Sequence, residues 1–235
     1  MSIRRAYFTY AASMGRKADD GGVLATVLRR AFGGGRVLVG VDGVDGSGKT
    51  TFADSLAALA SRDGRAVVRI GLDNFLKASA VRYRRGRDSP EGFWLDSYNY
   101  GRFREWVLEP LRGDGFYREA CHDLATDSSL CPPLQQAPSD CLVLIDGMFL
   151  HRDELAGVWD VSVFLDVPFT VTAERMAIRD GSNPDPEHLS MRRYVQGQRL
   201  YLGGCDPASR ATFVVDNSDP GARRFVEPES VSYRA

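Results

Sequence analysis

The sequence predicts an α/β protein in which helices cover both faces of a mainly parallel β-sheet. Short apolar runs alternate along the chain with segments of helical character, which is typical of parallel strands joined by crossover helices. The first of these runs leads into a glycine-rich loop, and three later ones end in an aspartate. The chain has 235 residues, of which 43% are hydrophobic, and this suits one domain with a sizeable core.

Five apolar runs are the predicted strands, so we expect a five-stranded sheet. The runs are residues 37–41, 66–70, 141–146, 161–166 and 212–216. The third run is the clearest, because Leu142 to Ile145 is continuously apolar, as in strands that are buried on both faces.

Helices are predicted around and between these strands, at residues 23–30, 51–60, 100–111, 171–179 and 187 to about 201. We expect the whole chain, 1–235, to form a single domain with a helical extension at 1–35 and a lid region at about 175–200. The tail from Pro220 onward is expected to be loosely ordered.

The stretch from Gly43 to Thr50 fits the phosphate-binding pattern G-x-x-x-x-G-K-[ST] at every fixed position. A glycine-rich turn could match by chance, but here a predicted strand precedes the loop and a predicted helix follows it. The glycines let backbone N–H groups approach phosphate oxygens, Lys49 can reach the β- and γ-phosphates, and the Thr50 hydroxyl is the expected Mg²⁺ ligand. The predicted nucleotide-binding residues are Gly43, Asp45, Gly46, Ser47, Gly48, Lys49, Thr50 and Thr51.

Two aspartates follow predicted strands at the carboxyl edge of the sheet, where ligands bind in this fold class. Asp146 matches the second acidic element of nucleotide-hydrolysing P-loop proteins, which holds Mg²⁺; a helix N-cap is its weaker alternative. Asp73 stands where an acceptor hydroxyl would approach, and its carboxylate could take or orient the hydroxyl proton. A cap for the segment that begins near Asn74 explains the position of Asp73 equally well.

Four arginines lie in or beside the lid region. Arg175 and Arg179 are four residues apart in a predicted helix and therefore share one face, and Arg192 and Arg193 follow after a polar loop. As a set they could close over phosphates and stabilise charge in the transition state. Taken singly, each is better explained as part of a solvated helical face.

The remaining polar and aromatic candidates are weaker. His122 and Asp123 could line a substrate pocket, whereas a lone histidine such as His151 is more often structural. The aromatic residues Phe93, Trp94, Tyr98 and Tyr100 are expected in the core rather than as a base-stacking surface.

Composition excludes several classes of function. The net charge of −1 gives no electrostatic footprint for nucleic acid, no apolar run reaches the length of a membrane span, and no apolar stretch of a secretory signal follows the basic N-terminus. The four cysteines form no C-x-x-C pair, so we expect reduced thiols, no zinc site and a cytoplasmic protein.

These motifs together resemble the uridine kinase and phosphoribulokinase branch of the P-loop kinases, and the bacterial uridine kinase-like proteins in particular. The likeness runs from about Arg36 to Asn217. It is carried by the glycine-rich loop, by Asp73-Asn74-Phe75, by Ile145-Asp146-Gly147, by Arg175 to Asp180 with Arg192, and by the segments 192–202 and 214–217. It implies the nucleoside monophosphate kinase-like P-loop fold, with three α/β/α layers and a helical lid.

The resemblance also implies roles for single residues. Asp73 would act as the base, Lys49 would hold phosphates, Thr50 and Asp146 would hold Mg²⁺, and Arg175 and Arg179 would belong to the lid. The chain departs from the family where uridine kinases carry an aspartate that grips the ribose hydroxyls, because Phe93 stands there. Leu76 also replaces a frequent aromatic residue. Other contacts to the substrate could come from Tyr83, Phe93, Asp96 and Asp123.

The resemblance implies ATP-dependent phosphorylation of a hydroxyl on a small molecule, with uridine or cytidine as the first-choice acceptor and self-association left open. A kinase of the same fold for another alcohol, such as a pantothenate-like metabolite, a sugar phosphate or a specialised metabolite, is the alternative. A nucleotide-switched regulator is less favoured, because the Asn-Lys-x-Asp guanine signature is absent from the sequence.

Overall fold

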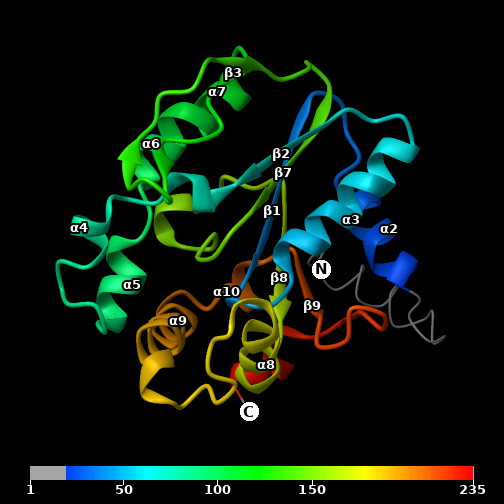
Figure 1. The fold of residues 1–235 in the computed structure, drawn as a ribbon. Coiled ribbons are helices and arrows are strands. Elements are labelled where there is room, and N and C mark those ends of the chain that lie inside the picture. Colours follow the sequence, from blue (N-terminus) through cyan, green and yellow to red (C-terminus); the bar gives the residue numbers. More distant parts are fainter. Residues whose placement is uncertain (1–19, 235) are drawn as a thin grey trace.

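The computed structural model describes residues 20–234 (Figure 1). The first nineteen residues of the expected extension lie outside the described residues, as does Ala235. The rest of the extension holds helix α2 (Asp20–Arg30), which packs on helix α3 (Lys49–Arg62). No helix within 20–234 has both the length and the apolar character that crossing a membrane requires.

The centre of the fold is a six-stranded sheet with the order β10-β9-β8-β1-β7-β2. The strands are β1 (Arg36–Gly43), β2 (Val67–Gly71), β7 (Cys141–Asp146), β8 (Val161–Asp166), β9 (Phe213–Asp216) and β10 (Arg224–Phe225). All neighbours pair in parallel except β9 and β10. The first five are the predicted strands, and β1 therefore lies in the middle of the sheet, between β7 and β8.

The sixth strand corrects two expectations about the C-terminal part of the chain. The sequence predicts five strands and a loosely ordered tail, but β10 pairs antiparallel with β9, and both Arg223 and Val231 are buried. A strand of two residues is too short to show any periodicity. The tail is fixed by contacts with distant residues, such as the hydrogen bonds that Ser232 donates to the carboxylate of Asp166.

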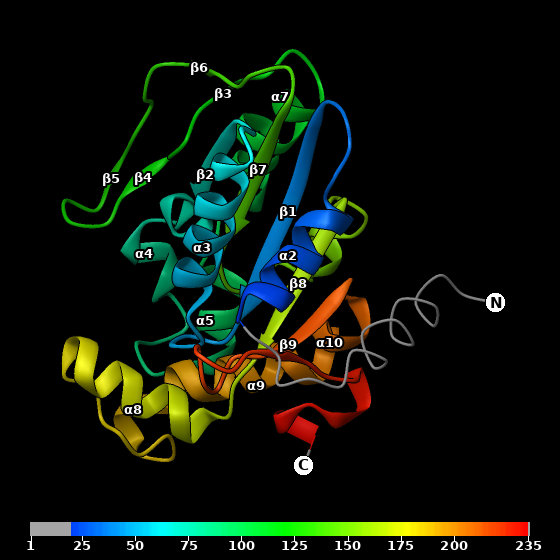
Figure 2. The same ribbon diagram turned by 90° about the vertical axis from the view of Figure 1, so that its right-hand side faces the viewer.

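Alternate residues of each central strand enter two separate cores, because side chains in a strand point to opposite faces. Leu38, Val143 and Ile145 pack on one face with residues of the helical segments 90–112 and 192–210. Val39, Val41 and Leu144 pack on the other face with α2 and α3. Figure 2 shows α2 and α3 together on their side of the sheet. The predicted three-layer α/β/α arrangement is confirmed.

The helices connect and cover the strands nearly as predicted. They are α4 (Ser79–Arg82), α5 (Pro90–Asp96), α6 (Tyr100–Phe103), α7 (Glu109–Arg112), α8 (Phe169–Asp180), α9 (Arg192–Cys205) and α10 (Pro207–Arg210). A π-helical turn, Arg104–Leu108, joins α6 to α7, so the helical segment predicted at 100–111 is present. The helix predicted from residue 187 begins later, at Arg192, after a single turn at Leu189–Met191.

Short elements complete the fold. A 3₁₀ turn, Leu72–Phe75, follows β2 directly, and further 3₁₀ turns lie at Asp153–Leu155, Pro228–Ser230 and Ser232–Arg234. Two small antiparallel pairs, β3 (Phe116–Tyr117) with β6 (Gln135–Gln136) and β4 (His122–Asp123) with β5 (Ser128–Ser129), occupy the connection to β7. In Figure 1 the carboxyl ends of β1 and β8 point down toward α8 and α9, and α5 lies beside α9.

Candidate active site

The glycine-rich loop joins the end of β1 to the start of α3, as the motif predicts. Gly46 and Gly48 have φ angles of 74° and 87°, in the left-handed region that favours glycine. A Cβ atom on Gly46 would lie 2.7 Å from the carbonyl oxygen of Thr172, and one on Gly48 would lie 2.9 Å from Nδ2 of Asn217. Only glycine therefore lets the loop pack this closely between α8 and the end of β9.

Polar groups of the loop fit a bound phosphate chain. The Ser47 hydroxyl is fully buried and has no hydrogen-bond partner within residues 20–234. The ammonium group of Lys49 donates across the loop to the carbonyl of Val44 at 2.8 Å. An orphaned hydroxyl, a lysine that turns back over its own loop and a following helix N-terminus are together suited to phosphate oxygens. The Thr51 side chain is exposed at the start of α3.

The two predicted Mg²⁺ ligands lie in direct contact. Oγ1 of Thr50 donates to Oδ2 of Asp146 at 2.7 Å. The other carboxylate oxygen of Asp146 accepts from Arg69 at 2.9 Å, and Arg69 also pairs with Asp54. The part of the chain that the structure describes holds no group of three or more His, Cys, Asp and Glu side chains able to bind a metal. A hydroxyl and one carboxylate fit Mg²⁺, which usually keeps waters and takes further oxygens from phosphates.

Asp73 lies in the 3₁₀ turn after β2, where its side chain is exposed, and Tyr98 donates to its Oδ1 at 2.7 Å. The backbone holds the two residues together, because the N–H groups of Lys77 and Asn99 bond to the carbonyls of Ser97 and Phe75. Burial, followed by the charge of Asp73, raises the pKa of Tyr98 far above its usual value. The phenol therefore stays protonated and serves as a fixed donor to the carboxylate.

A buried polar network lies at the end of β1, directly before the glycine-rich loop. Asp42 is fully buried, and its carboxylate accepts from the N–H of Gly43, from the backbone N–H and Nδ1 of His151, and from the hydroxyl of Tyr201. His151 is therefore part of the structure of the site, as its isolation in the sequence suggests. The network ties β1 to α9.

Helix α8 brings both of its predicted arginines to the loop. Arg175 donates to the carbonyls of Gly46, Asn217 and Ser218, and burial lowers its pKa. Arg179 lies 3.4 Å from the carboxylate of Asp45 and also pairs with Asp180. The shared face that the four-residue spacing predicts thus borders the loop. Arg175 is held by carbonyl oxygens, while Arg179 is more than half exposed.

Helix α9 also contributes a residue to the loop and another to the neighbouring segment. Oε1 of Gln198 accepts from the N–H of Asp45 at 2.5 Å. Arg193 is buried and donates to the carbonyls of Arg82, Gly86 and Ser89, so it anchors the segment between α4 and α5 to α9. Arg192 is exposed at the first residue of the same helix.

The four residues suggested for substrate contact differ in how open they are. Phe93 is 7% exposed, and its ring packs edge-on against Phe149 and Tyr194. Asp96 is 1% exposed and pairs with Arg84 and Arg85, so its carboxylate is already occupied. Asp123 is half-buried in the β4–β5 hairpin, where it accepts from the N–H of Ala125.

Tyr83 is the fourth of these residues, and it is half-buried beside several arginines. The aromatic residues expected in the core follow that prediction, because Phe93 and Tyr98 are buried and Trp94 and Tyr100 pack partly buried against the same core. A core position does not exclude Tyr98 from the site, since its hydroxyl reaches Asp73.

Sequence reasoning missed Asp42, Arg69, Gln198, Tyr201 and the hydrogen bond of Tyr98. Asp42 interrupts an apolar strand beside the motif, and a buried acid in that position signals a partner in space. Arg69, Gln198 and Tyr201 belong to a strand and a helix whose pattern gives only an inward or outward direction, and Tyr98 lies in the connection between α5 and α6. The hydrogen bonds that join them to the site span 25 to 159 residues of the chain.

No family model matches the chain. Among solved structures, it is similar to a possible uridine kinase from Bacillus stearothermophilus, with a TM-score of 0.67 and 22% identity over 83% of this chain and 96% of that one. A putative fructose transport system kinase from Silicibacter sp. TM1040 gives 0.64 and 24% over 79% and 95%. Phosphoribulokinase from Rhodobacter spheroides gives 0.53 and 17% over 84% and 82%. The expected fold is confirmed: it is that of these P-loop kinases.

Proposed function

We propose that the protein is an ATP-dependent kinase that transfers the γ-phosphate to a hydroxyl group of a small molecule. The observation that carries the proposal is the meeting of three elements at neighbouring strand ends. The glycine-rich loop follows β1, the contact between Thr50 and Asp146 joins α3 to the end of β7, and Asp73 follows β2. The P-loop kinase fold of the solved neighbours supports the same reaction class.

Each of these residues has a role in the proposed reaction. The loop and Lys49 would bind the phosphates, and Thr50 and Asp146 would hold Mg²⁺, which neutralises phosphate charge when it is bound. Asp73 would accept or orient the proton of the attacking hydroxyl. Arg179 is free enough to turn toward developing charge. Arg175 borders the loop but has to leave its three carbonyl partners before it can contribute.

The acceptor is the finer part of the proposal. A pyrimidine nucleoside, phosphorylated on its 5′-hydroxyl, is one candidate, and the neighbour described as a possible uridine kinase supports it. A non-nucleoside alcohol is the second. Two observations favour the second candidate. Phe93 is buried and has no carboxylate, and the carboxylate of Asp96 is already paired, so neither side chain can bind the hydroxyls of a ribose. A cytoplasmic location suits either candidate, because ATP is available there. Free thiols are also usual there, and the cysteines within the described residues are all free.

Acceptor-dependent formation of ADP tests the proposed reaction. The purified protein with ATP and Mg²⁺ is expected to release ADP only when a suitable alcohol is added from a panel of nucleosides, sugars, sugar phosphates and hydroxy acids. Asp73→Asn is expected to lower the turnover by about 10²–10⁴-fold, as for loss of a general base, while ATP binding persists. Wild-type turnover of Asp73→Asn would remove the assigned role of this carboxylate.

Self-association remains a prediction that light scattering of the purified chain can check.

A further inference from the structure

Three guanidinium groups surround the ring of Tyr83, in the segment between β2 and α5. The guanidinium carbon lies 4.7 Å from the ring centre for Arg193, 4.9 Å for Arg87 and 5.3 Å for Arg82. Two of these arginines, with Arg84 and Arg85, come from the six-residue stretch 82–87. Such a concentration of positive charge opposes folding unless negative charge offsets it.

The carboxylates nearby offset only part of this charge. Asp96 is occupied by Arg84 and Arg85, and Asp127 lies 3.9 Å from Arg82. Within residues 20–234 neither Arg87 nor Arg193 makes an ion pair. Burial is the largest influence on the pKa of Arg193 and lowers it, while the charge of Asp88 acts in the opposite direction. Carbonyl oxygens and aromatic rings hold the buried charge of Arg193 without a carboxylate, so an added anion beside it would be stabilising.

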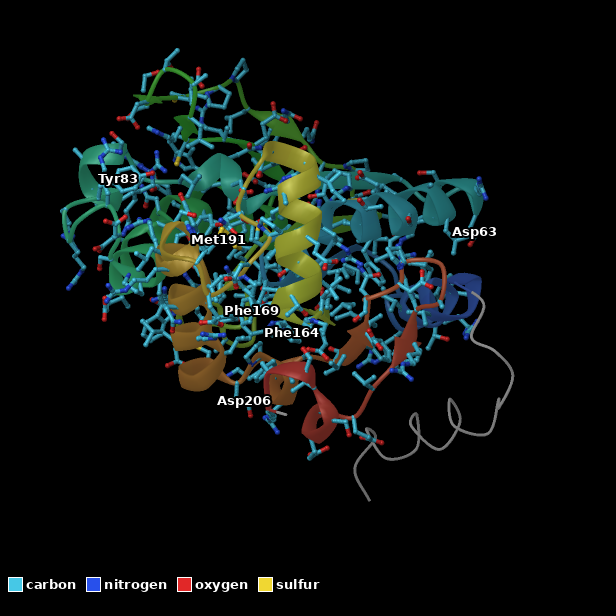
Figure 3. The ribbon with its side chains drawn as sticks, turned by 60° about the horizontal axis from the view of Figure 1, so that its bottom comes forward. Asp63, Tyr83, Phe164, Phe169, Met191 and Asp206 are labelled. Atoms are coloured by element: carbon cyan, nitrogen blue, oxygen red, sulfur yellow. The ribbon has the colours of Figure 1, made fainter. Side chains whose placement is uncertain are left out.

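A chain of ring contacts connects this cluster to Tyr98, the partner of Asp73. Arg193 also lies over the ring of Phe93, which packs on Phe149, and Phe149 in turn packs on Tyr98. Tyr194 on α9 links the two regions, because its ring packs against Phe93 and the charges of Arg193, Asp45 and Arg82 all act on its hydroxyl. Asp45 belongs to the glycine-rich loop. Figure 3 looks toward the carboxyl ends of the strands and shows Tyr83 at the rim, with Met191 at the start of α9 between Tyr83 and α8.

The fixed backbone of the segment makes the cluster a prepared site rather than a flexible charged surface. Arg193 clamps three carbonyls of the segment 82–89. Arg82 bonds to the carbonyl of Lys77 at 2.8 Å. Arg87 has no hydrogen bond of its own among the described residues and stays exposed. The planar fork of an unpaired arginine is suited to two oxygens of a phosphate or carboxylate.

We propose that the acceptor of the kinase carries an anionic group, a phosphate or a carboxylate, which binds between Arg87 and Arg193 beside Tyr83. The inference rests on the proposed kinase function, and it names the substrate class of that same site. Arg87 supplies the free donors, Arg193 supplies fixed positive charge, and the hydroxyl of the acceptor extends toward Asp73. A neutral nucleoside leaves the buried charge of Arg193 without a counterion.

Matched pairs of acceptors test the proposal through the release of ADP. Ribose 5-phosphate is compared with ribose, and glycerate with glycerol, with uridine as the neutral nucleoside. We expect turnover with an anionic member and a kcat/KM at least about tenfold lower with its neutral partner, because a charged hydrogen bond is lost. The two pairs distinguish a phosphate from a carboxylate as the recognised group.

Variants of Arg87 locate the anion. Arg87→Gln is expected to raise KM for the anionic acceptor about tenfold or more and to leave KM for ATP unchanged, while Arg87→Lys keeps the charge and restores part of the loss. Arg62→Gln, at the exposed end of α3, is the control for loss of one arginine. Circular dichroism verifies that each variant is folded.

The outcomes separate the two proposals. ADP release with uridine or another neutral alcohol, unchanged in Arg87→Gln, overturns the anionic acceptor and leaves the kinase standing. A rise in KM for ATP instead of the acceptor also overturns it, since Arg87 would then serve the donor. Nucleotide binding without ADP release for every acceptor overturns the kinase itself.

Discussion

The hydroxyl of Tyr98 donates to Oδ1 of Asp73 at 2.7 Å, and it does so from a fully buried ring at the edge of an exposed carboxylate. One oxygen of Asp73 is thereby held, and the other remains open to an approaching hydroxyl. A general base needs this kind of fixed orientation, because proton transfer depends on geometry before it depends on basicity. Tyr98 is thus a positioning residue in the proposed reaction.

Replacement of Tyr98 by Phe is expected to lower kcat about tenfold, the effect of losing a hydrogen bond to a charged group. KM for ATP is expected to stay the same, because the donor site is untouched. Steady-state kinetics of both parameters check this. Tyr117→Phe, which removes a tyrosine hydroxyl bonded to Gln135 in a distant hairpin, is the control. Equal kcat in the two variants would contradict the positioning role.

Asp146→Asn is expected to raise the Mg²⁺ concentration needed for half-maximal activity by about tenfold or more, since a carboxylate ligand is replaced by a neutral amide. Asp54→Asn supplies a matched control, because Arg69 pairs with both carboxylates and Asp54 is the exposed partner. Activity measured over a Mg²⁺ titration distinguishes them. A similar rise in the required Mg²⁺ concentration in both variants would show that the loss of an ion pair with Arg69, and not the loss of a metal ligand, causes the effect.

The buried network of Asp42 is expected to contribute to stability. Tyr201→Phe removes one donor from a fully buried carboxylate, and we expect the free energy of unfolding to fall by about 1.5–3 kcal/mol. Denaturant unfolding measures the change. Tyr194→Phe, on the same helix but partly exposed, should change stability little. A neutral effect of Tyr201→Phe would show that the remaining donors satisfy Asp42.

Stability is expected to depend on pH through Asp96. The hydrogen bond from Arg84, helped by that from Arg85, lowers the pKa of Asp96 in spite of burial. A lowered pKa in the folded state contributes stability above the unfolded pKa of about 3.9, and this stability is lost as the pH falls through the folded pKa. The stability gap between the wild type and Asp96→Asn should therefore be widest near neutral pH and narrow below about pH 4.

Unfolding curves from neutral to acidic pH measure that gap. Asp88→Asn, an exposed carboxylate of the same segment, is the control and should show no such trend. A gap that stays constant down to low pH would contradict the assigned ion pairs.

The strands and the glycine-rich loop could be predicted because local sequence determines them. A continuous apolar run such as Leu142 to Ile145 has few alternatives to a buried strand. The spacing of Gly43, Gly48 and Lys49 predicts the loop directly, because phosphate binding requires these residue types at these positions. The proximity of Asp73 and Asp146 could be predicted for a related reason. The carboxyl ends of parallel strands lie at one edge of the sheet. Two acidic residues that follow two such strands are therefore expected to lie close together, even when the packing of the helices is unknown.

The partners of these residues could not be predicted, because they depend on how distant elements pack. The sequence predicts Tyr98 as a core aromatic residue, and its ring is buried, but its hydroxyl donates a hydrogen bond to Asp73. Arg193 reads as a surface arginine of an amphipathic helix, but α5 and α9 pack so closely that it is buried. Gly197 permits this approach, since a Cβ atom there would lie 2.8 Å from the carbonyl of Pro90. The sequence has 24 glycines, and nothing in it indicates which of them permits a close approach of two helices.

Asp45 in the glycine-rich loop holds both lid helices at once, through its N–H to Gln198 on α9 and through its carboxylate to Arg179 on α8. In the proposed reaction, phosphate oxygens that enter the loop would compete with Gln198 for that N–H. If nucleotide binding weakens the contact between α9 and the loop, thermodynamic reciprocity requires the converse. Loss of that contact then raises the affinity for nucleotide by the same factor. Because Tyr194 and Arg193 belong to α9, the affinities for donor and acceptor in the proposed reaction would be coupled through Asp45 of the loop.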